Sequence, residues 1–327
     1  MQLRQILAVV DASAAGVQAG WRAARLAWAH GATLSLVAPV ALPDRHPASR
    51  HGPSAPPVRM RAALSDLAGS MAAAIGVRPK VAVDLEGEGG ALLHKQARAA
   101  SLVVVPASAG PAGATAWWQG NLAERLLREA GVPVLLVRRP AGTAHRSALV
   151  ATGLDAEAAG PLLHAAGWLC RPDGVLACHV LDPTIQRHLH AADLPLSTVA
   201  SWMETAARRA ELVLGQQLVQ AGLQAGQALV LQGPALARLL HAQHSRAASL
   251  LVVGKPRRSR WADLLRPALA RQLAARVACD VLWLPDPLPS AELARQRMRR
   301  VDAPVPLAPP GGPSVLAPQC AGVRPQP

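Results

Sequence analysis

The chain has 327 residues, which is enough for two ordinary domains with complete cores. A hydrophobic content of 51% excludes general disorder, and no apolar run is long and uncharged enough to predict a membrane span. The net charge of +14 comes almost entirely from arginine, in a chain without Phe or Tyr. This skew is typical of a GC-rich coding bias, so the charge predicts weak attraction to polyanions and no specific nucleic-acid binding.

The first half predicts strands alternating with helices. The apolar run ILAVV at 6–10 is typical of a strand buried on both faces, and Asp11 and Ser13 are good residues to begin a helix. Further strands are expected at 33–40, 80–85, 101–105 and 133–137, and helices at 16–31, 59–75, 89–99 and 120–130. A proline-rich loop occupies 41–58.

After a linker at 138–147 the same order returns. Strands are expected at 148–152, 175–180, 228–232, 250–253 and 280–284, and helices at 156–170, 198–221, 234–246 and 264–276. Beyond Pro285 the chain has helical potential at 290–300 and then becomes proline-rich, which predicts a disordered tail. The expected division is a first domain at 1–140, a second at 147–286 and the tail at 287–327.

The two halves contain a similar sequence segment. Residues 92–105 read LLHKQARAASLVVV and residues 239–253 read LLHAQHSRAASLLVV, with Ser101 and Ser249 at matching positions. The alternating pattern used twice predicts the α/β class: two tandem, doubly wound, Rossmann-like parallel sheets.

The segments ILAVVDAS, SLVVV and GNLAERLLREAGVPVLLVRR together resemble the universal stress protein family, over essentially all of residues 1–286. The resemblance implies a fold like that of the adenine nucleotide alpha hydrolases, in the tandem two-domain branch. It also implies that last strands pair between domains. We therefore expect VPVLLV and CDVLWL to pair within the chain as a pseudo-dimer, and a homodimer is a further expectation.

Nucleotide-binding members carry G-x2-G-x9-G-(S/T) after the fourth strand and an Asp after the first. In the first copy Asp11 takes the place of the Asp that contacts the nucleoside, and the glycine pattern becomes Ala107, Gly110, Gly120 and Asn121. Asn121 still offers a donor to a phosphate oxygen. Two interpretations stay open: an eroded ATP cradle, or a glycine-rich turn that begins the next helix.

The second copy departs further from the pattern. Gly254, Arg257, Pro267 and Ala268 keep the spacing but lose most of the glycines, and Asp155 follows its strand after two extra residues. Ordinary ATP binding is not expected in this half. Its cationic loop favours a different anion or, more simply, a solvated surface.

Other patterns predict little chemistry. His179, His188 and His190 have no acidic or cysteine partner at metal-ligand spacing, so no metal site is predicted. The four cysteines lack CxxC spacing and are expected to be reduced and structural. No nucleophile-base pair or hydrolase motif is found, so no catalytic residue is predicted.

The resemblance therefore predicts a cytoplasmic, non-enzymatic stress-response protein, a binding and signalling module with weak ATP or other adenine-nucleotide binding in the first domain. The absence of a signal peptide before the first strand agrees with the cytoplasmic location. Two alternatives remain: a binder of another small or amphiphilic molecule in the second domain, and a nucleotide hydrolase.

Overall fold

The computed structural model describes residues 3–11, 13–39, 57–84, 91–107, 131–142, 144–181, 195–254, 272–273 and 276–285. Their strands form one ten-stranded sheet in the order β3-β2-β1-β4-β5-β10-β9-β6-β7-β8. The expected helices at 120–130 and 264–276 fall largely or wholly outside these ranges, and the tail falls outside them entirely.

The first half supplies five parallel strands and three described helices. The strands are β1 (Gln5–Val9), β2 (Thr33–Pro39), β3 (Lys80–Asp84), β4 (Leu102–Pro106) and β5 (Val134–Val137). The helices are α1 (Ala14–His30), α2 (Pro57–Ile75) and α3 (Ala91–Ala99). Each element lies where the apolar pattern predicts it. Ser13 begins α1 by accepting a hydrogen bond from the Gly16 N–H, and Gly31, at φ 61°, ends it.

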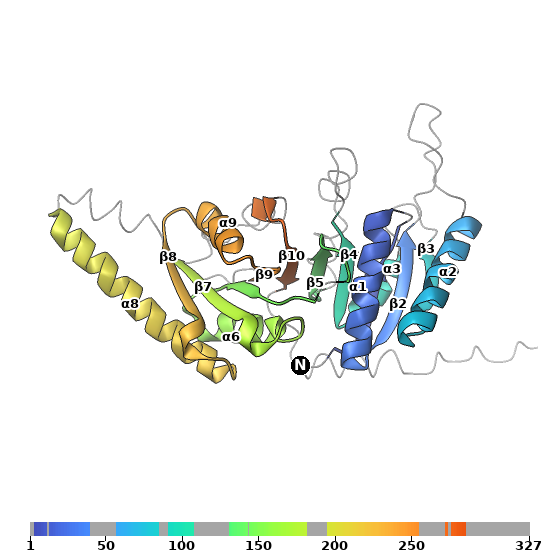
Figure 1. Cartoon of the computed structure of the whole chain (residues 1–327), viewed down its shortest axis with the longest axis horizontal. Coiled ribbons are helices and arrows are strands. Elements are labelled where there is room, and N and C mark those ends of the chain that lie inside the picture. The colour runs from blue at the N-terminus through green and yellow to red at the C-terminus, as the bar shows by residue number, and fades with distance from the viewer. Residues whose placement is uncertain are drawn as a thin grey trace, which may run out of the picture.

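The second half repeats the arrangement. Its strands are β6 (Ala148–Ala151), β7 (Val175–Leu181), β8 (Ala228–Gln232), β9 (Leu250–Gly254) and β10 (Asp280–Leu284). Its helices are α6 (Ala156–Ala166), α8 (Leu196–Gln220) and α9 (Ala235–Ser245), with short 3₁₀ turns η2 (Pro172–Gly174) and η3 (Ala225–Gln227). Helix α6 ends four residues earlier than predicted. The 25-residue α8 runs along the outer edge of this half (Figure 1).

The repeated serine explains how the two halves begin. The Ser101 hydroxyl accepts the Gln5 N–H at 3.1 Å and donates to the Gln5 carbonyl at 2.7 Å. The Ser249 hydroxyl makes the same pair of bonds with Ser147, at 3.1 and 2.8 Å. Each serine thus fastens the fourth strand of its half to the entry of the first strand.

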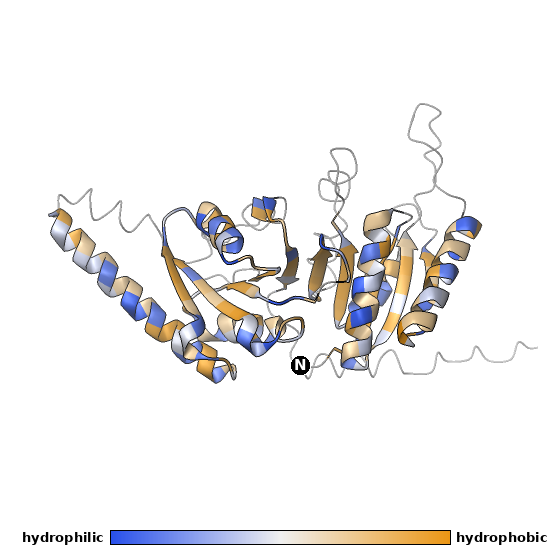
Figure 2. Cartoon of the chain, in the orientation of Figure 1, coloured by the Kyte–Doolittle hydropathy of each residue, from blue (hydrophilic) through white to orange (hydrophobic). Residues whose placement is uncertain are grey.

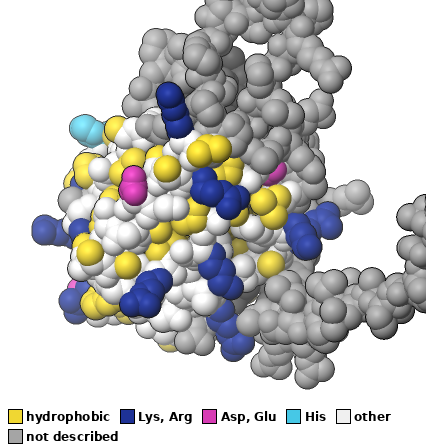
Figure 3. Space-filling model, turned by 90° about the vertical axis from the view of Figure 1, so that its right-hand side faces the viewer, with side chains coloured by type: hydrophobic (Ala, Val, Ile, Leu, Met, Phe, Trp, Pro, Cys, Tyr) yellow, Lys and Arg dark blue, Asp and Glu magenta, His cyan; other side chains and the backbone are white. Residues whose placement is uncertain are grey.

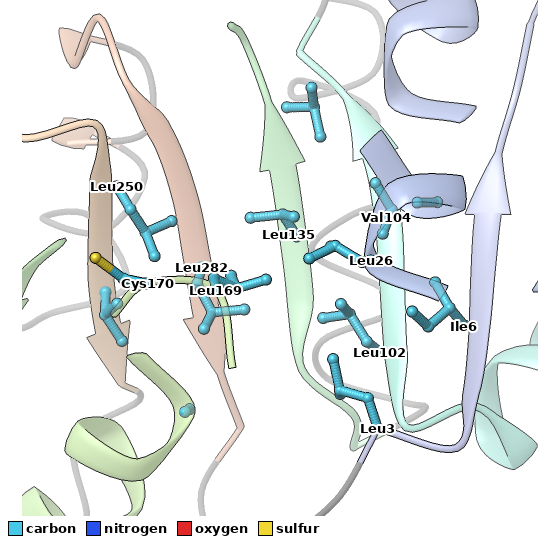
Figure 4. Close-up of a cluster of buried hydrophobic side chains, with 14 of the residues drawn as sticks. Leu3, Ile6, Leu26, Leu102, Val104, Leu135, Leu169, Cys170, Leu250 and Leu282 are labelled. Carbon is cyan, nitrogen blue, oxygen red and sulfur yellow. The ribbon is translucent and has the colours of Figure 1, made fainter. Parts of the chain in front are cut away.

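The two halves join through β5 and β10, as expected. These strands are antiparallel, whereas the other described strand pairs are parallel. The strands are apolar while the outward sides of the helices are polar (Figure 2). On one face of the sheet a single apolar cluster continues across the joint, from Leu102 and Leu135 in the first half to Leu282 and Leu250 in the second (Figure 4).

Candidate functional site

Asp11 stands at the carboxyl end of β1, where the strand order reverses. Strand β2 lies on one side of β1 and β4 on the other, so the crevice beyond β1 and β4 is the place where such sheets bind ligands. The Asp11 side chain is half-buried there. Its Oδ1 accepts the Ser13 N–H at 3.1 Å and the Ser13 hydroxyl, while Ser13 caps α1. The structure therefore holds Asp11 at the strand-order reversal, beside the N-terminus of α1.

Gly16 leaves the room that this arrangement needs. A Cβ at position 16 would lie 2.1 Å from the Asp11 Oδ1 and 2.6 Å from its backbone nitrogen. Non-bonded contacts of a Cβ atom are essentially never this short, so a larger side chain would displace either the carboxylate or the first turn of α1. The sequence interpretation assigned no role to this glycine.

Ala107, the first position of the predicted phosphate loop, follows β4 and is buried. Its N–H donates to the Val137 carbonyl at 2.8 Å, so the sheet already uses this donor. Gly110, Gly120 and Asn121 lie outside the described residues. The structure thus describes Asp11 and Ala107 on adjacent strand ends and does not describe the rest of the predicted loop.

The strand register settles what corresponds to Asp11 in the second half. Ile6 pairs with Leu102, and Ala148 pairs with Leu250 in the same way. Counting five residues onward, Asp11 corresponds to Gly153. Asp155 instead corresponds to Ser13, because it is the N-cap of α6 and accepts the Glu157 N–H at 3.1 Å. Asp155 therefore begins a helix, and the second half has no carboxylate at the Asp11 position.

Gly254 also needs a corrected alignment. It is the last residue of β9 and corresponds to Pro106 at the end of β4, not to Ala107. A Cβ on Gly254 would come within 3.0 Å of the Leu162 side chain on α6. This glycine lets α6 pack closely on the sheet, which is a structural role.

Part of the carboxyl edge of the second half, as far as the structure describes it, is apolar. Leu154 packs with Leu181, Val199 and Met203 in a cluster between β7 and α8. At the end of β3 the first half has buried Asp84, whose Oδ2 accepts the Leu93 N–H at 3.1 Å and so fixes the start of α3. The strand register places Leu231 at the corresponding position of β8. Among the described residues, the carboxylates of Asp11 and Asp84 at this edge of the first half thus have no carboxylate at the corresponding positions of the second half.

The surroundings of His179 indicate a structural role. It is buried on β7, and its Nδ1 lies 3.0 Å from the Thr152 carbonyl oxygen. Burial lowers the pKa of His179, an effect that this hydrogen bond partly opposes, so the neutral ring is favoured. No group of three His, Cys, Asp or Glu side chains in the described part of the chain is arranged to hold a metal. His188 and His190 lie outside that part.

Positive side chains are scattered over the end of the molecule formed by α2 and β3. Figure 3 shows separate Lys and Arg side chains with apolar and neutral surface between them. Arg59, Arg61, Arg78 and Lys80 are exposed here, together with Asp66. Cations dispersed in this way support only weak, salt-screened attraction. In the described ranges, no helix has the length and apolar character required to cross a membrane.

A family model described as the universal stress protein family matches residues 2–138 and again 145–285. The chain belongs to this family. The two matches place one universal stress protein domain in each half, in agreement with the repeated sheet. A search of curated proteins found no match to the chain.

Solved structures share the fold over most of this chain. A putative universal stress protein from Pseudomonas aeruginosa UCBPP-PA14 is 18% identical, with a TM-score of 0.54 over 91% of this chain and 97% of that one. A universal stress protein from Archaeoglobus fulgidus is 14% identical, with a TM-score of 0.59 over 87% and 97%. A functionally unknown protein from Pseudomonas aeruginosa PAO1 is 18% identical, with a TM-score of 0.55 over 91% and 96%.

Proposed function

We propose that this universal stress protein is a non-enzymatic, cytoplasmic binding module whose first domain weakly binds ATP or another adenine nucleotide. The observation that carries the proposal is the asymmetry between the two carboxyl edges: Asp11 stands at the strand-order reversal of the first half, and Gly153 takes its place in the second. A carboxylate at this crevice offers an acceptor to the hydroxyl or amino groups of a nucleoside.

The geometry around Asp11 supports this role. Ser13 engages Oδ1, and within the described residues Oδ2 accepts no hydrogen bond. A ligand would therefore meet Oδ2. The second domain lacks this acceptor and has the apolar cluster of Leu154, Leu181, Val199 and Met203 at its edge, so we assign nucleotide binding to the first domain alone.

The test is ATP binding by the full chain, measured by equilibrium dialysis and by native mass spectrometry. Asp11→Ala is expected to weaken binding by about tenfold or more, because it removes a charged hydrogen-bond acceptor. Ser13→Ala is the matched control, since it disturbs the same helix cap and leaves the carboxylate in place. Unchanged affinity in Asp11→Ala, or equal losses in both variants, would refute the assignment.

Turnover distinguishes the binding module from a hydrolase. Purified protein incubated with labelled ATP is expected to release no phosphate above the background of the Asp11→Ala variant. Release that depends on Asp11 would show that the domain is an enzyme.

A further inference from the structure

The joint between the halves has an internal symmetry. Because Val103 pairs with Val134 and Leu251 pairs with Val281, β5 and β10 occupy the same place in the two halves. Across the joint the pairs are Val281 with Leu136, Leu282 with Leu135 and Trp283 with Val134. Leu135 and Leu282, themselves equivalent, face each other at the centre. The two strands are thus related by a local pseudo-twofold axis.

This symmetry creates a choice of partners. A strand that pairs with its own counterpart about a twofold axis can also pair with the identical strand of a second molecule. The backbone of the joint is therefore compatible with a β5–β5 or a β10–β10 pair between two copies. Such pairs would leave the chain open and able to associate further. Something other than the ladder must favour β5 with β10.

Asp280, at the start of β10, is fully buried and bound on all sides. Its Oδ1 accepts the N–H groups of Arg138, at 2.7 Å, and Arg139, at 2.8 Å, just after β5. Its Oδ2 lies 2.8 Å from the Nε2 of His145 and 3.4 Å from the Nη2 of Arg22 on α1. Every one of these partners comes from the first half or the linker.

This cluster has no equivalent at the other end of the joint. The register places Pro133 at the position of Asp280, and Pro285 at the position of Arg138. In a β5–β5 pair centred on Leu135, Pro133 would face Val137, and no carboxylate would be available to the Arg138 and Arg139 N–H groups. In a β10–β10 pair centred on Leu282, Asp280 would face Leu284, and the place of Arg138 would be taken by Pro285, which has no N–H to donate.

We propose that Asp280 is the residue that commits β5 to pair with β10 and selects against β5–β5 and β10–β10 pairs between copies. In a β10–β10 pair Asp280 would lose the Arg138 N–H and the Arg22 guanidinium, both of the first half, and a buried carboxylate that loses such donors is strongly unfavourable, so that pair is penalised. The choice of strand partner therefore depends on the Asp280 cluster, which is asymmetric, and not on the β5–β10 hydrogen bonds, which are nearly symmetric. It is independent of nucleotide binding.

The linker keeps this pairing within one chain. Arg22 donates to the Pro140 carbonyl at 3.0 Å, and the Ala141 N–H donates to Gln18 Oε1 at 2.7 Å, so α1 fixes the chain directly after β5. His145, just before β6, then reaches Asp280. The connection between the halves is therefore folded against the joint that it spans.

Cysteines at the centre of the joint report which strands have paired. Opposite residues of antiparallel strands have Cα atoms about 4.5–5.5 Å apart, within disulfide range. The full-length Leu135→Cys/Leu282→Cys protein is refolded at high concentration and oxidised, and peptide mass spectrometry counts 135–282, 135–135 and 282–282 disulfides. We expect the 135–282 product to dominate, and Asp280→Ala to raise the share of same-strand products by about tenfold or more.

Two further variants complete the design. Asp173→Ala removes an exposed, ion-paired Asp of the second half and is expected to leave the product ratio unchanged. Pro133→Asp, with Asp280 intact, supplies the missing carboxylate to a β5–β5 pair and is expected to raise the 135–135 product, which tests the proposal even if Asp280→Ala fails to fold. An unchanged ratio in Pro133→Asp, or in a folded Asp280→Ala protein, would overturn the proposal.

Discussion

Gly16 and Gly69 are both helical glycines, but their surroundings are opposite. A Cβ on Gly16 meets Asp11, whereas a Cβ on Gly69 of α2 meets nothing within 4 Å. We expect Gly16→Ala to destabilise the protein by about 1–3 kcal/mol through overpacking. Gly69→Ala should stabilise it by about 0.5–1 kcal/mol, because alanine is the better helix residue. Urea denaturation midpoints measure both effects, and equal shifts would show that Asp11 does not constrain Gly16.

Ala247 has the left-handed conformation, with φ 46°, between α9 and β9. The second half has one residue more than the first between its Leu-Leu-His sequence and its serine, and this extra residue is accommodated here. We expect Ala247→Gly to raise the free energy of unfolding by about 0.5–1 kcal/mol, since glycine adopts positive φ without strain. Ala242→Gly, inside α9, is the contrasting control and should destabilise the protein.

Ser101 and Ser249 each hold the start of a first strand, β1 or β6, in place. Ser101→Ala and Ser249→Ala each remove a hydroxyl that both accepts and donates at the entry of a first strand. Each change should cost about 1–3 kcal/mol, because part-buried backbone groups lose their partner. Hydrogen exchange should rise in β1 for one variant and in β6 for the other. Faster exchange confined to solvent-exposed loops would contradict this role.

The elements were the most predictable part of the fold. Apolar runs such as ILAVV and CDVLWL placed buried strands, and glycines such as Gly31 placed helix ends, because these signals are local. That Asp155 corresponds to Ser13, and not to Asp11, could not be predicted from such local signals. Two acidic residues near a strand end look alike in a sequence, and only the pairing of Ala148 with Leu250 distinguishes a helix cap from a ligand-edge carboxylate.

For the whole molecule, the Asp280 cluster predicts how stability changes with acid. Burial by itself would raise the pKa of Asp280, but the hydrogen bonds from His145 and from the Arg139 and Arg138 N–H groups outweigh it, so the pKa lies below its usual value. A depressed folded-state pKa adds stability that is fully present above the unfolded value of about 3.9 and is lost as the pH falls through the folded value.

The stability difference between the wild type and Asp280→Asn should therefore shrink as the pH falls below about pH 4. Thermal unfolding as a function of pH measures it, with Asp173→Asn as the exposed control. A difference that stays constant down to pH 2 would show that the carboxylate charge does not stabilise the joint.

The same cluster marks where prediction from sequence stopped. The pairing of the two last strands was expected, yet the partners of Asp280 come from positions as distant as Arg22 and His145. A charged residue at the head of an apolar strand was the available signal. It indicates a buried partner without identifying it, because the partner depends on how the halves meet.

The joint also sets an order of events during synthesis. Strand β5 ends at Val137, but its neighbour β10 ends only at Leu284, after the entire second half has been made. At about 5–20 residues per second the ribosome needs roughly 7–30 s to cover that interval. Throughout this interval, the nascent first domain carries an apolar strand edge with no partner in its own chain. This is therefore the stage at which the domain most needs protection by chaperones.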